Sequence, residues 1–413
     1  MSRKRVVVTG LGSLTSLGVG MERLWDGLVQ GQSGIAPVEG FDVSAHATRF
    51  AGQCRDYVVE DHFLPIQSKK LDVFTQYGLV AAKEALLDSG LNLESLDRKR
   101  IGCIAGSGIG GIHELEAMHS ILLERGPGRI SPHFIPKLMV NALSGQISIT
   151  YGLQGPNFVT GSACASAGNA IGMALRAIQY GEADVIFTGG SEAAITPLGL
   201  GGFCALKALS TRNDDPQGAS RPFDAERDGF VMGDGASIIV LEELEHARKR
   251  DARIYAEVYG YGSTADAFHI TAPKEDGDGP ARAIQQALDD GSVRPEQVGY
   301  INAHGTSTPY NDAIETTAIK KVFGEYAKKL AVSSTKSMVG HLLGASAAVE
   351  FAVLCKSVYH NVVHPTLNLE NPDPACDLDY VPGAARDWDV TYGLSNSLGF
   401  GGHNVSLLAG KVR

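Results

Sequence analysis

Short runs of β-branched and apolar residues alternate with helix-like patterns along almost the whole sequence. The runs cover residues 6–8, 101–104, 185–188, 237–241, 253–259, 299–303, 330–333 and 404–408. Between them lie segments such as 73–89 and 281–290, in which apolar residues recur every three or four positions. This alternation is typical of βαβ units whose sheet is covered by helices. It predicts an α/β fold.

No Pro-rich linker or low-complexity tract separates domains. The 413 residues suffice for one large α/β unit or for roughly two to three domains. The expected boundary lies near residue 250, after the charged segment LEELEHARKR, and gives the halves 1–250 and 251–413. Both halves share the rhythm of strands and helices but show no clear sequence repeat.

Composition argues against several classes of protein. The six cysteines lie far apart, without a C-x-x-C pair or a zinc-ligand cluster, which suits a reducing compartment. A formal net charge of -10 argues against general binding of nucleic acid, which needs basic faces. The start MSRKRVVVTG lacks the apolar core of a signal peptide, and no apolar run reaches about 18 residues. We therefore expect a cytoplasmic protein that binds neither nucleic acid nor membrane.

The segment TGSACASAG at 160–168 places one cysteine, Cys164, among glycine, serine, alanine and threonine. After it, apolar residues at 167, 170, 171, 174, 175 and 178 recur as on the buried face of a helix that Gly181 ends. Cys164 is expected at the helix N-terminus, where the macrodipole and free N–H groups lower the pKa of a thiol. Its small neighbours leave room for a thioester. The alternative is a buried cysteine that acts as a small hydrophobe.

Two histidines lie in similar surroundings, His304 in YINAHGTSTPYND and His341 in SSTKSMVGHLLGASAAVE. Each is expected where a strand leads into a loop. Together with a helix-capped cysteine they make a site that can activate a thiol or hydrogen-bond a carbonyl, although each alone is more often an ordinary surface or core histidine. Lys336 and Glu350 are either a buried ion pair or a surface lysine and a solvated helix glutamate.

A third glycine-rich segment, GLSNSLGFGGHN at 393–404, surrounds Phe400 with glycines. We expect a loop whose backbone freedom lets the aromatic side chain move. The alternative is a tight turn before the last strand.

Four segments in this order, TGSACASAG, NAHGTST, STKSMVGHLLGASAAVE and SNSLGFGGHN, resemble the β-ketoacyl-acyl carrier protein synthases of the condensing-enzyme, thiolase-like superfamily. The resemblance runs from RVVVTGLGSLTSLG to the end of the sequence. GSGIGG at 106–111 and STRNDDPQGASRPFDAERDGFVMGDGA at 210–236 are most similar to the elongating type II synthases. The resemblance implies a five-layered αβαβα fold of two similar halves, and a homodimer.

The resemblance also implies a reaction. Cys164 would accept an acyl chain from acyl carrier protein, and His304 and His341 would hold the malonyl thioester carbonyl and stabilise the enolate that decarboxylation produces. The backbone N–H groups of Cys164 and Phe400 would hold the oxyanion, and the Phe400 side chain would act as a gate. The activity implied is a decarboxylative condensation that extends an acyl chain by two carbons and needs no organic cofactor.

Other residues receive roles from the same resemblance. Lys336 and Glu350 would form a pair that positions the His341 loop without touching the substrate. The substrate pocket would be lined by Ile109, Phe134, Thr306, Thr308 and Phe400. The acidic carrier protein would dock on Lys69, Lys70, Arg129 and Lys207. A monovalent cation, Na⁺ or K⁺, would lie near Asn302, Glu350, Ser395 and Asn396.

The sequence departs from the family pattern at Tyr310-Asn311, where a small residue and glycine are expected, and at Phe223, which replaces a tryptophan. Alternatives are a ketosynthase or a chain-length-factor subunit of a type II polyketide pathway; such factors typically lack the cysteine. A thiolase would have a second cysteine in the C-terminal glycine-rich loop, where GFGGHN has none. An oxidoreductase is suggested only by GLGSLTSLG, which is not a G-x-G-x-x-G fingerprint.

Overall fold

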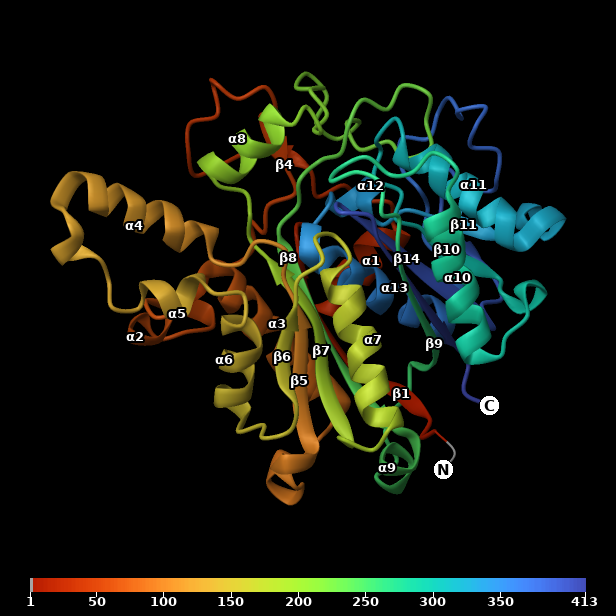
Figure 1. Ribbon diagram of the computed structural model, residues 1–413, viewed down its shortest axis with the longest axis horizontal. Coiled ribbons are helices and arrows are strands. Elements are labelled where there is room, and N and C mark those ends of the chain that lie inside the picture. The colour runs from red at the N-terminus through yellow and green to blue at the C-terminus, as the bar shows by residue number, and fades with distance from the viewer. Residues whose placement is uncertain (1–2) are drawn as a thin grey trace.

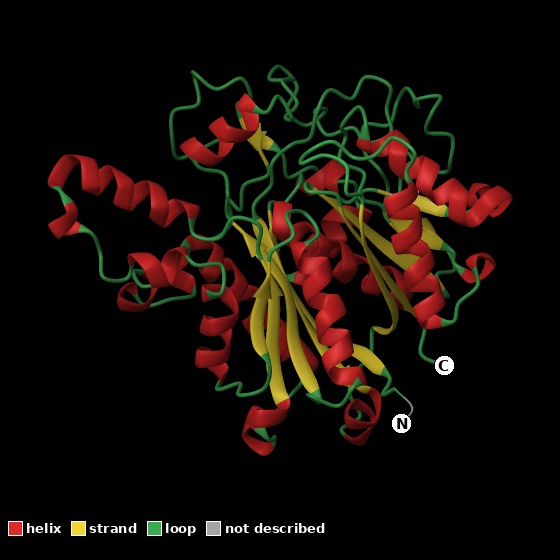
Figure 2. Ribbon diagram, in the orientation of Figure 1, coloured by secondary structure: helices red, strands yellow, loops and turns green. Residues whose placement is uncertain are grey.

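The computed structural model describes residues 3–413, in which two related sheets alternate with layers of helices (Figure 1, Figure 2). In the first sheet, β5 (Ile101–Gly106) is parallel to β6 (Asn157–Thr160) and β7 (Val185–Glu192). On its other side β7 pairs antiparallel with β8 (Gly235–Glu243), and β8 with β1 (Val6–Thr15). β6 forms the edge of this sheet.

The second sheet repeats this arrangement. Here β10 (Tyr300–Asn302) is parallel to β11 (Ala331–Ser333) and β14 (Tyr392–Gly399). β14 is antiparallel to β15 (His403–Gly410), which pairs with β9 (Ala256–Ala265). A short antiparallel pairing of β1 with β9 joins the two sheets into one hydrogen-bonded path.

Three layers of helices separate and cover the sheets. The first sheet is covered on its outer face by α3 (Val73–Ser89) and α6 (Ala142–Tyr151), and the second by α10 (Asp278–Gly291) and α11 (Asn311–Phe323). Between the sheets lie α7 (Ser166–Gln179) and α13 (Ser346–His360), each of which packs against strands of both. The expected five-layered αβαβα fold is confirmed.

The remaining elements are short or lie outside these layers. They are β2 (Gly18–Val19), α1 (Met21–Val29), β3 (Ala36–Pro37), β4 (Phe50–Ala51), α2 (Pro65–Ser68), α4 (Ile112–Arg125), α5 (Phe134–Leu138), α8 (Pro197–Ala205), α9 (Leu244–Lys249), α12 (Lys336–Val339), β12 (Val362–Val363) and β13 (Arg386–Asp387). Short 3₁₀ helices within residues 3–413 lie at Val59–Asp61, Leu93–Ser95, Arg98–Arg100, Pro127–Arg129, Pro295–Gln297, Gly324–Lys329 and Leu343–Ala345. No helix within residues 3–413 is both long and apolar enough to cross a membrane.

The glycines of GLGSLTSLG pack the first strand against a helix. Gly10 and Gly12 lie inside β1, and a Cβ on either would collide with the backbone of α3 at Ala85 or Ala81. Close packing of strand and helix therefore explains the glycines. Because residues 10–15 are buried strand and only the two-residue turn 16–17 separates β1 from β2, the segment forms no phosphate-binding loop before a helix, and the oxidoreductase alternative loses its only support.

Each expected strand is present, but two expectations about the second half were wrong. Residues 393–399, expected as loop, form most of β14, and only the turn at 400–402 separates it from β15. Both histidines were expected where a strand leads into a loop. His304 does lie just after β10, but His341 does not lie just after β11, because α12 lies between them. The boundary expected near residue 250 falls between α9 and β9.

Candidate active site

The nucleophile candidate, Cys164, lies in a tight turn between β6 and the start of α7, as expected. The residue before it, Ala163, has φ 51°, in the left-handed region that non-glycine residues rarely adopt. Ser166 holds this turn, because its hydroxyl donates to Ala163 O at 2.7 Å and accepts the Ser162 N–H at 2.9 Å. The turn presents the sulfur to a pocket although Cys164 is only 7% exposed.

The predicted low pKa of this cysteine was wrong. Burial raises the pKa of the Cys164 thiol to about 11, although the charge of Lys336 and the backbone N–H of Phe400 lower it in part. The loss of solvation disfavours the thiolate more than the nearby backbone N–H groups and the Lys336 ammonium favour it. At neutral pH the Cys164 side chain is therefore a thiol.

His341 contacts this thiol directly. Its Nε2 lies 3.1 Å from Cys164 Sγ, and its Nδ1 accepts the Leu343 N–H at 3.2 Å and lies 2.8 Å from Ser346 Oγ. Because Nδ1 accepts a backbone N–H, the proton of the neutral ring is on Nε2. Burial and the charge of Lys336 hold the pKa of His341 well below its usual value. His341 is therefore a neutral N–H donor.

His304 has the same character. Its ring centroid lies 5.4 Å from that of His341, and its Nδ1 lies 3.3 Å from Lys336 Nζ, which also donates to His304 O at 2.7 Å. Burial, Lys336 and His341 hold the pKa of His304 well below its usual value. An ammonium at Nδ1 again leaves the proton on Nε2. The two histidines are thus paired neutral donors from the second half of the chain.

Lys336 and Glu350 form the expected buried ion pair, each side chain being 2% exposed. Burial raises the pKa of Glu350 to about 7, against the lowering effect of Lys336. The ammonium contacts His304, whereas the Lys336 backbone begins α12, which leads to His341. The pair therefore links the supports of both histidines.

Cys164 and the two histidines line one pocket of about 540 Å³. Its lining includes Cys164, both histidines and four of the five expected substrate residues, Ile109, Thr306, Thr308 and Phe400. The fifth, Phe134, begins α5 and is not among the residues that line the pocket of a single chain. Beside the sulfur, the backbone N–H groups of Phe400 and of Cys164 itself stabilise negative charge.

Sequence reasoning missed two buried glutamates that shape this pocket. Glu192, at the end of β7, accepts the N–H groups of Gly108 at 2.6 Å, Ile109 at 3.1 Å, Gly110 at 3.3 Å and Gly344 at 3.0 Å, and the Ser107 hydroxyl at 3.0 Å. It ties the loop after β5 to the segment after His341.

The second is Glu315 of α11, which accepts the N–H groups of His304 and Gly305, each at 2.9 Å. It thereby fixes the backbone of the His304 loop. Both glutamates accept hydrogen bonds from backbone groups of other segments, so no local sequence motif predicts their role.

Comparison with known proteins decides the family. Residues 3–247 match the family described as "Beta-ketoacyl synthase, N-terminal domain", and residues 255–370 match "Beta-ketoacyl synthase, C-terminal domain". The chain belongs to the β-ketoacyl synthase family. Among β-ketoacyl synthases, the 3-oxoacyl-[acyl-carrier-protein] synthase 2 of Synechocystis sp. is 51% identical over 407 residues, 98% of each chain. That of Vibrio harveyi is 49% identical over 413 residues, the whole of both chains.

Solved structures of β-ketoacyl synthases agree in fold. One from Burkholderia phymatum STM815 superposes with a TM-score of 0.91 at 35% identity, covering 99% of this chain and 100% of the other. A ketosynthase in complex with a type II PKS acyl-carrier protein superposes with a TM-score of 0.91 at 36% identity over the whole of both chains.

Three of the four residues expected near a cation carry unpaired oxygens. Asn302 Oδ1, Glu350 Oε2 and Ser395 Oγ are buried and have no hydrogen-bond partner among residues 3–413. The Asn396 side chain is instead engaged by Glu315 at 3.2 Å and Ser406 at 2.9 Å. Buried oxygens without partners are rare, and oxygen atoms are the ligands of hard cations, so this set fits Na⁺ or K⁺.

The expected docking residues of this β-ketoacyl synthase are all exposed but lie on separate elements. Lys207 follows α8 on the rim of the active-site pocket, whereas Lys70 borders a different hollow beside α3 and α6. Lys69 follows α2, and Arg129 ends the turn after α4. A carrier protein that contacts all four would have to span several surface elements.

Proposed function

We propose that this protein is a 3-oxoacyl-[acyl-carrier-protein] synthase that extends carrier-bound acyl chains by two carbons. The observation that carries the proposal is the triad of Cys164, His304 and His341, in which a thiol lies beside two neutral imidazole donors in one buried pocket. Relatives that are 49–51% identical over nearly their whole length carry this name, which supports the proposal.

In the first half-reaction, Cys164 Sγ attacks the thioester carbon of an acyl carrier protein. The new Sγ–C bond forms as the bond to the pantetheine sulfur breaks, and the thiol proton leaves with the released pantetheine thiol. The tetrahedral oxyanion would lie beside the N–H groups of Cys164 and Phe400, which already lie beside the sulfur in the resting site. His341 Nε2–H donates to the sulfur while that atom carries charge.

In the second half-reaction, the malonyl thioester loses carbon dioxide. The electrons of the broken C–C bond move into the thioester carbonyl, and the enolate oxygen accepts the Nε2–H groups of His304 and His341. Since both rings are neutral, they stabilise the enolate without protonating the carbanion too early. The carbanion attacks the acyl group on Cys164, the C–S bond breaks, and the cysteine thiolate takes a proton from water.

One assay tests this reaction. Malonyl and acyl carrier proteins are mixed with the enzyme, and we expect a 3-oxoacyl product two carbons longer than the primer by mass spectrometry, together with carbon dioxide. A polyketide ketosynthase would instead accumulate products of repeated condensation, and a chain-length factor would give none. The presence of Cys164 argues against a chain-length factor. The identity of 51% to a 3-oxoacyl-[acyl-carrier-protein] synthase, against 36% to a type II polyketide ketosynthase, favours a single extension.

We further propose that a monovalent cation binds Asn302, Glu350 and Ser395. When bound, it would offset the charge of Glu350 and order these oxygens behind His304. Thermal unfolding in K⁺ or Na⁺, compared with a bulky organic cation at equal ionic strength, should show a higher Tm with the small ions. An unchanged Tm would argue against the site.

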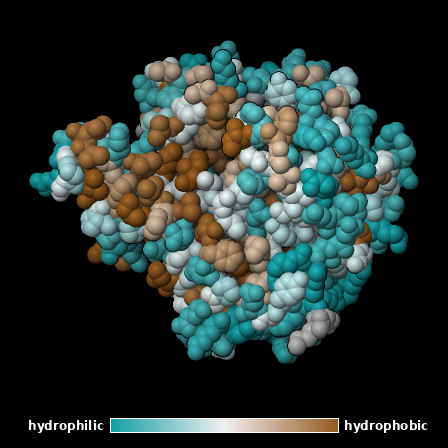
Figure 3. Space-filling view, in the orientation of Figure 1, coloured by the Kyte–Doolittle hydropathy of each residue, from teal (hydrophilic) through white to brown (hydrophobic). Residues whose placement is uncertain are grey.

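We also propose a homodimer built on β6. This strand is the edge of the sheet, its outer side pairs with no strand within residues 3–413, and Phe158 on it is 39% exposed. Beside it, apolar side chains gather over α4 and α5, where Leu123 is 73% and Ile135 54% exposed (Figure 3). A second copy paired along β6 would cover the edge and bring α5, with Phe134, close to the pocket of its partner. Sedimentation should give a dimer, and Phe158→Glu should weaken it.

We place this reaction in the cytoplasm, with an acidic acyl carrier protein as partner. Charge reversal at Lys69 and Lys70 should raise KM for carrier-linked substrates, and the effect should shrink in high salt. Unchanged kinetics at low ionic strength would remove both lysines from the docking face.

A further inference from the structure

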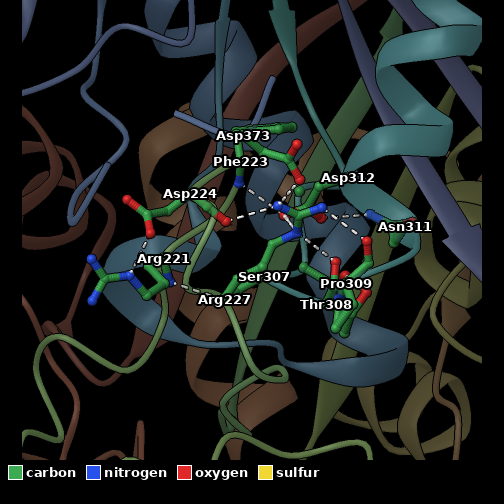
Figure 4. Close-up of polar contacts among 12 residues, drawn as sticks. Arg221, Phe223, Asp224, Arg227, Ser307, Thr308, Pro309, Asn311, Asp312 and Asp373 are labelled. Carbon is green, nitrogen blue, oxygen red and sulfur yellow. Dashed lines mark hydrogen bonds and ion pairs between the residues drawn. The ribbon is translucent and has the colours of Figure 1, made fainter. Parts of the chain in front are cut away.

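A buried arginine holds one wall of the active-site pocket from behind. The side chain of Arg227 is 3% exposed, and four of its hydrogen bonds are drawn in Figure 4. Nε donates to Thr308 O at 2.9 Å and Nη2 to Pro309 O at 2.8 Å. Nη1 donates to Asp224 O and to Asp373 Oδ2, each at 2.7 Å. One guanidinium thus donates hydrogen bonds to two successive carbonyls of the loop that follows His304.

That loop carries two of the expected substrate residues. Thr306 and Thr308 line the pocket, and their hydroxyl oxygens lie 2.9 Å apart. Between them Ser307 has φ 68°, and this strained conformation is held because its Oγ accepts the Arg221 N–H at 2.9 Å and its carbonyl accepts the Gly229 N–H at 3.2 Å. Tyr310, the residue that departs from the family pattern, lies on the rim and is 72% exposed.

The His304 end of the loop is fixed separately. Glu315 and Lys336 bind the backbone at residues 304 and 305, as described above. The far end, at Thr308 and Pro309, is held by Arg227 instead. The catalytic and substrate-facing ends of one loop therefore have different supports.

The charge of Arg227 explains why it cannot easily be replaced. A buried guanidinium needs charged partners, and Arg227 has Asp373 at 2.7 Å and the buried Asp312 at 3.6 Å. Asp312 in turn accepts the N–H of Phe223 at 2.9 Å. Phe223, the other departure from the family pattern, has φ 67° and stacks on Tyr380 with ring centroids 3.8 Å apart. A lysine would keep the charge but lose the planar fork that reaches both carbonyls.

The size of the pocket limits which part of the substrate can contact the loop 306–310. A carrier protein is folded and cannot enter a pocket of about 540 Å³, so only its flexible arm can bring a thioester to Cys164. The arm must then pass the loop 306–310 on its way from the rim to the sulfur. We infer that Arg227 is a positioning residue that holds this loop as the binding wall for the pantetheine arm of the substrate. The inference rests on the proposed function.

The test compares substrates with arms of different length. For Arg227→Lys, KM in malonyl decarboxylation should rise about five- to tenfold with the full arm, as malonyl-coenzyme A or malonyl carrier protein, the effect of losing roughly one hydrogen bond. With malonyl N-acetylcysteamine, which lacks the outer part of the arm, KM should change far less. The rate at which iodoacetamide alkylates Cys164 should stay unchanged, because Arg227 contacts neither the cysteine nor the histidines.

Arg221→Lys is the matched control. Arg221 is also buried, at 5% side-chain exposure, but its guanidinium pairs with Asp224 and only its backbone touches the loop. It should leave KM for all substrates near that of the wild type. Asp373→Asn, at a position 23% exposed, removes the charge that pairs with Arg227 but keeps the arginine in place. It should raise KM in the same direction but less, and it provides a test even if Arg227→Lys folds poorly.

The inference would be overturned by a fall in kcat alone with Arg227→Lys, by an equal rise in KM for short and full arms, or by the same rise in KM with Arg221→Lys. An effect confined to the carrier-linked substrate, without one on malonyl-coenzyme A, would move the contact to the carrier protein and also contradict it. If the wild type turns over none of these thioesters, the proposed function fails instead, whatever the variants do.

Discussion

His341 Nε2 lies 3.1 Å from Cys164 Sγ, yet burial keeps both groups uncharged at rest. The pair is therefore not a thiolate–imidazolium ion pair of the kind that activates many catalytic cysteines. Charge develops only as bonds change, and the N–H donors are already aimed at the atoms that will carry it.

The neutral thiol leads to a prediction about alkylation. Because burial raises the pKa of Cys164 to about 11, the rate of its reaction with iodoacetamide should keep rising with pH through the range in which the protein stays folded. Mass mapping of the labelled peptide measures it, and Cys164→Ala, which leaves little cavity among small neighbours, is the unlabelled and still folded control. A plateau below about pH 8 would mean that the helix end outweighs the loss of solvation.

The histidines should give malonyl decarboxylation an unusually flat pH profile. A free imidazole gains a proton near pH 6.5, but burial holds the pKa values of His304 and His341 well below that value, so both stay neutral as the pH falls. The rate should therefore be nearly constant from about pH 8 to about pH 6. Because the raised pKa of Glu350, about 7, lies in the same range, the control is Glu350→Gln: a loss of half the activity near pH 6.5 that persists in this variant would contradict the neutral pair.

Removing either ring should separate the two half-reactions. His304→Ala and His341→Ala should each lower decarboxylation by about a hundredfold or more, while acylation of Cys164 falls less, because the enolate loses one of its two donors. Release of carbon dioxide and transfer of a radiolabelled acyl group to the protein measure the steps separately. Equal losses in both would assign the histidines a structural role.

Glu192 should matter for stability and for the pocket. In Glu192→Gln an amide NH₂ replaces one oxygen and faces N–H donors, which should cost about 1–3 kcal/mol of unfolding free energy in a denaturant titration. The loop around Ile109 should also loosen, so preference among acyl primers should change. Glu182→Gln, at an exposed position, is the control. Unchanged stability and primer preference would show that the five donors find other partners.

Ile109 gives a prediction about chain length. It lines the pocket, and phenylalanine there should obstruct a long acyl chain at a cost of roughly 1–3 kcal/mol while sparing a short one. Comparing kcat/KM for hexanoyl- and tetradecanoyl-carrier protein tests this. A parallel fall for both would mean that Ile109 serves only packing.

Cys164, the two histidines and the Lys336–Glu350 pair were predictable because each lies in a local pattern of small residues, and the structure brings them together. Glu192 and Arg227 were not, since their partners are backbone groups of segments far away in the sequence. The pKa of Cys164 was mispredicted because a helix end is a local feature, whereas burial depends on every layer around it. β14 resembled a loop because a buried strand next to α13 needs small residues: a Cβ at Gly393 would meet Leu354.

The central layer of α7 and α13 also determines when, during synthesis, the chain can become active. As the chain is synthesised, Cys164 and α7 emerge long before α13, whose Ala347 packs against α7 at Gly168, together with Val405 of the last strand. Until then one apolar face of α7 lacks this partner, and exposed apolar surface on an incomplete chain promotes aggregation. Since His304 and His341 also arrive late, a nascent chain already contains the cysteine but none of the groups that hold the enolate. A chain of this protein therefore gains decarboxylation activity only after its second half has folded onto the first.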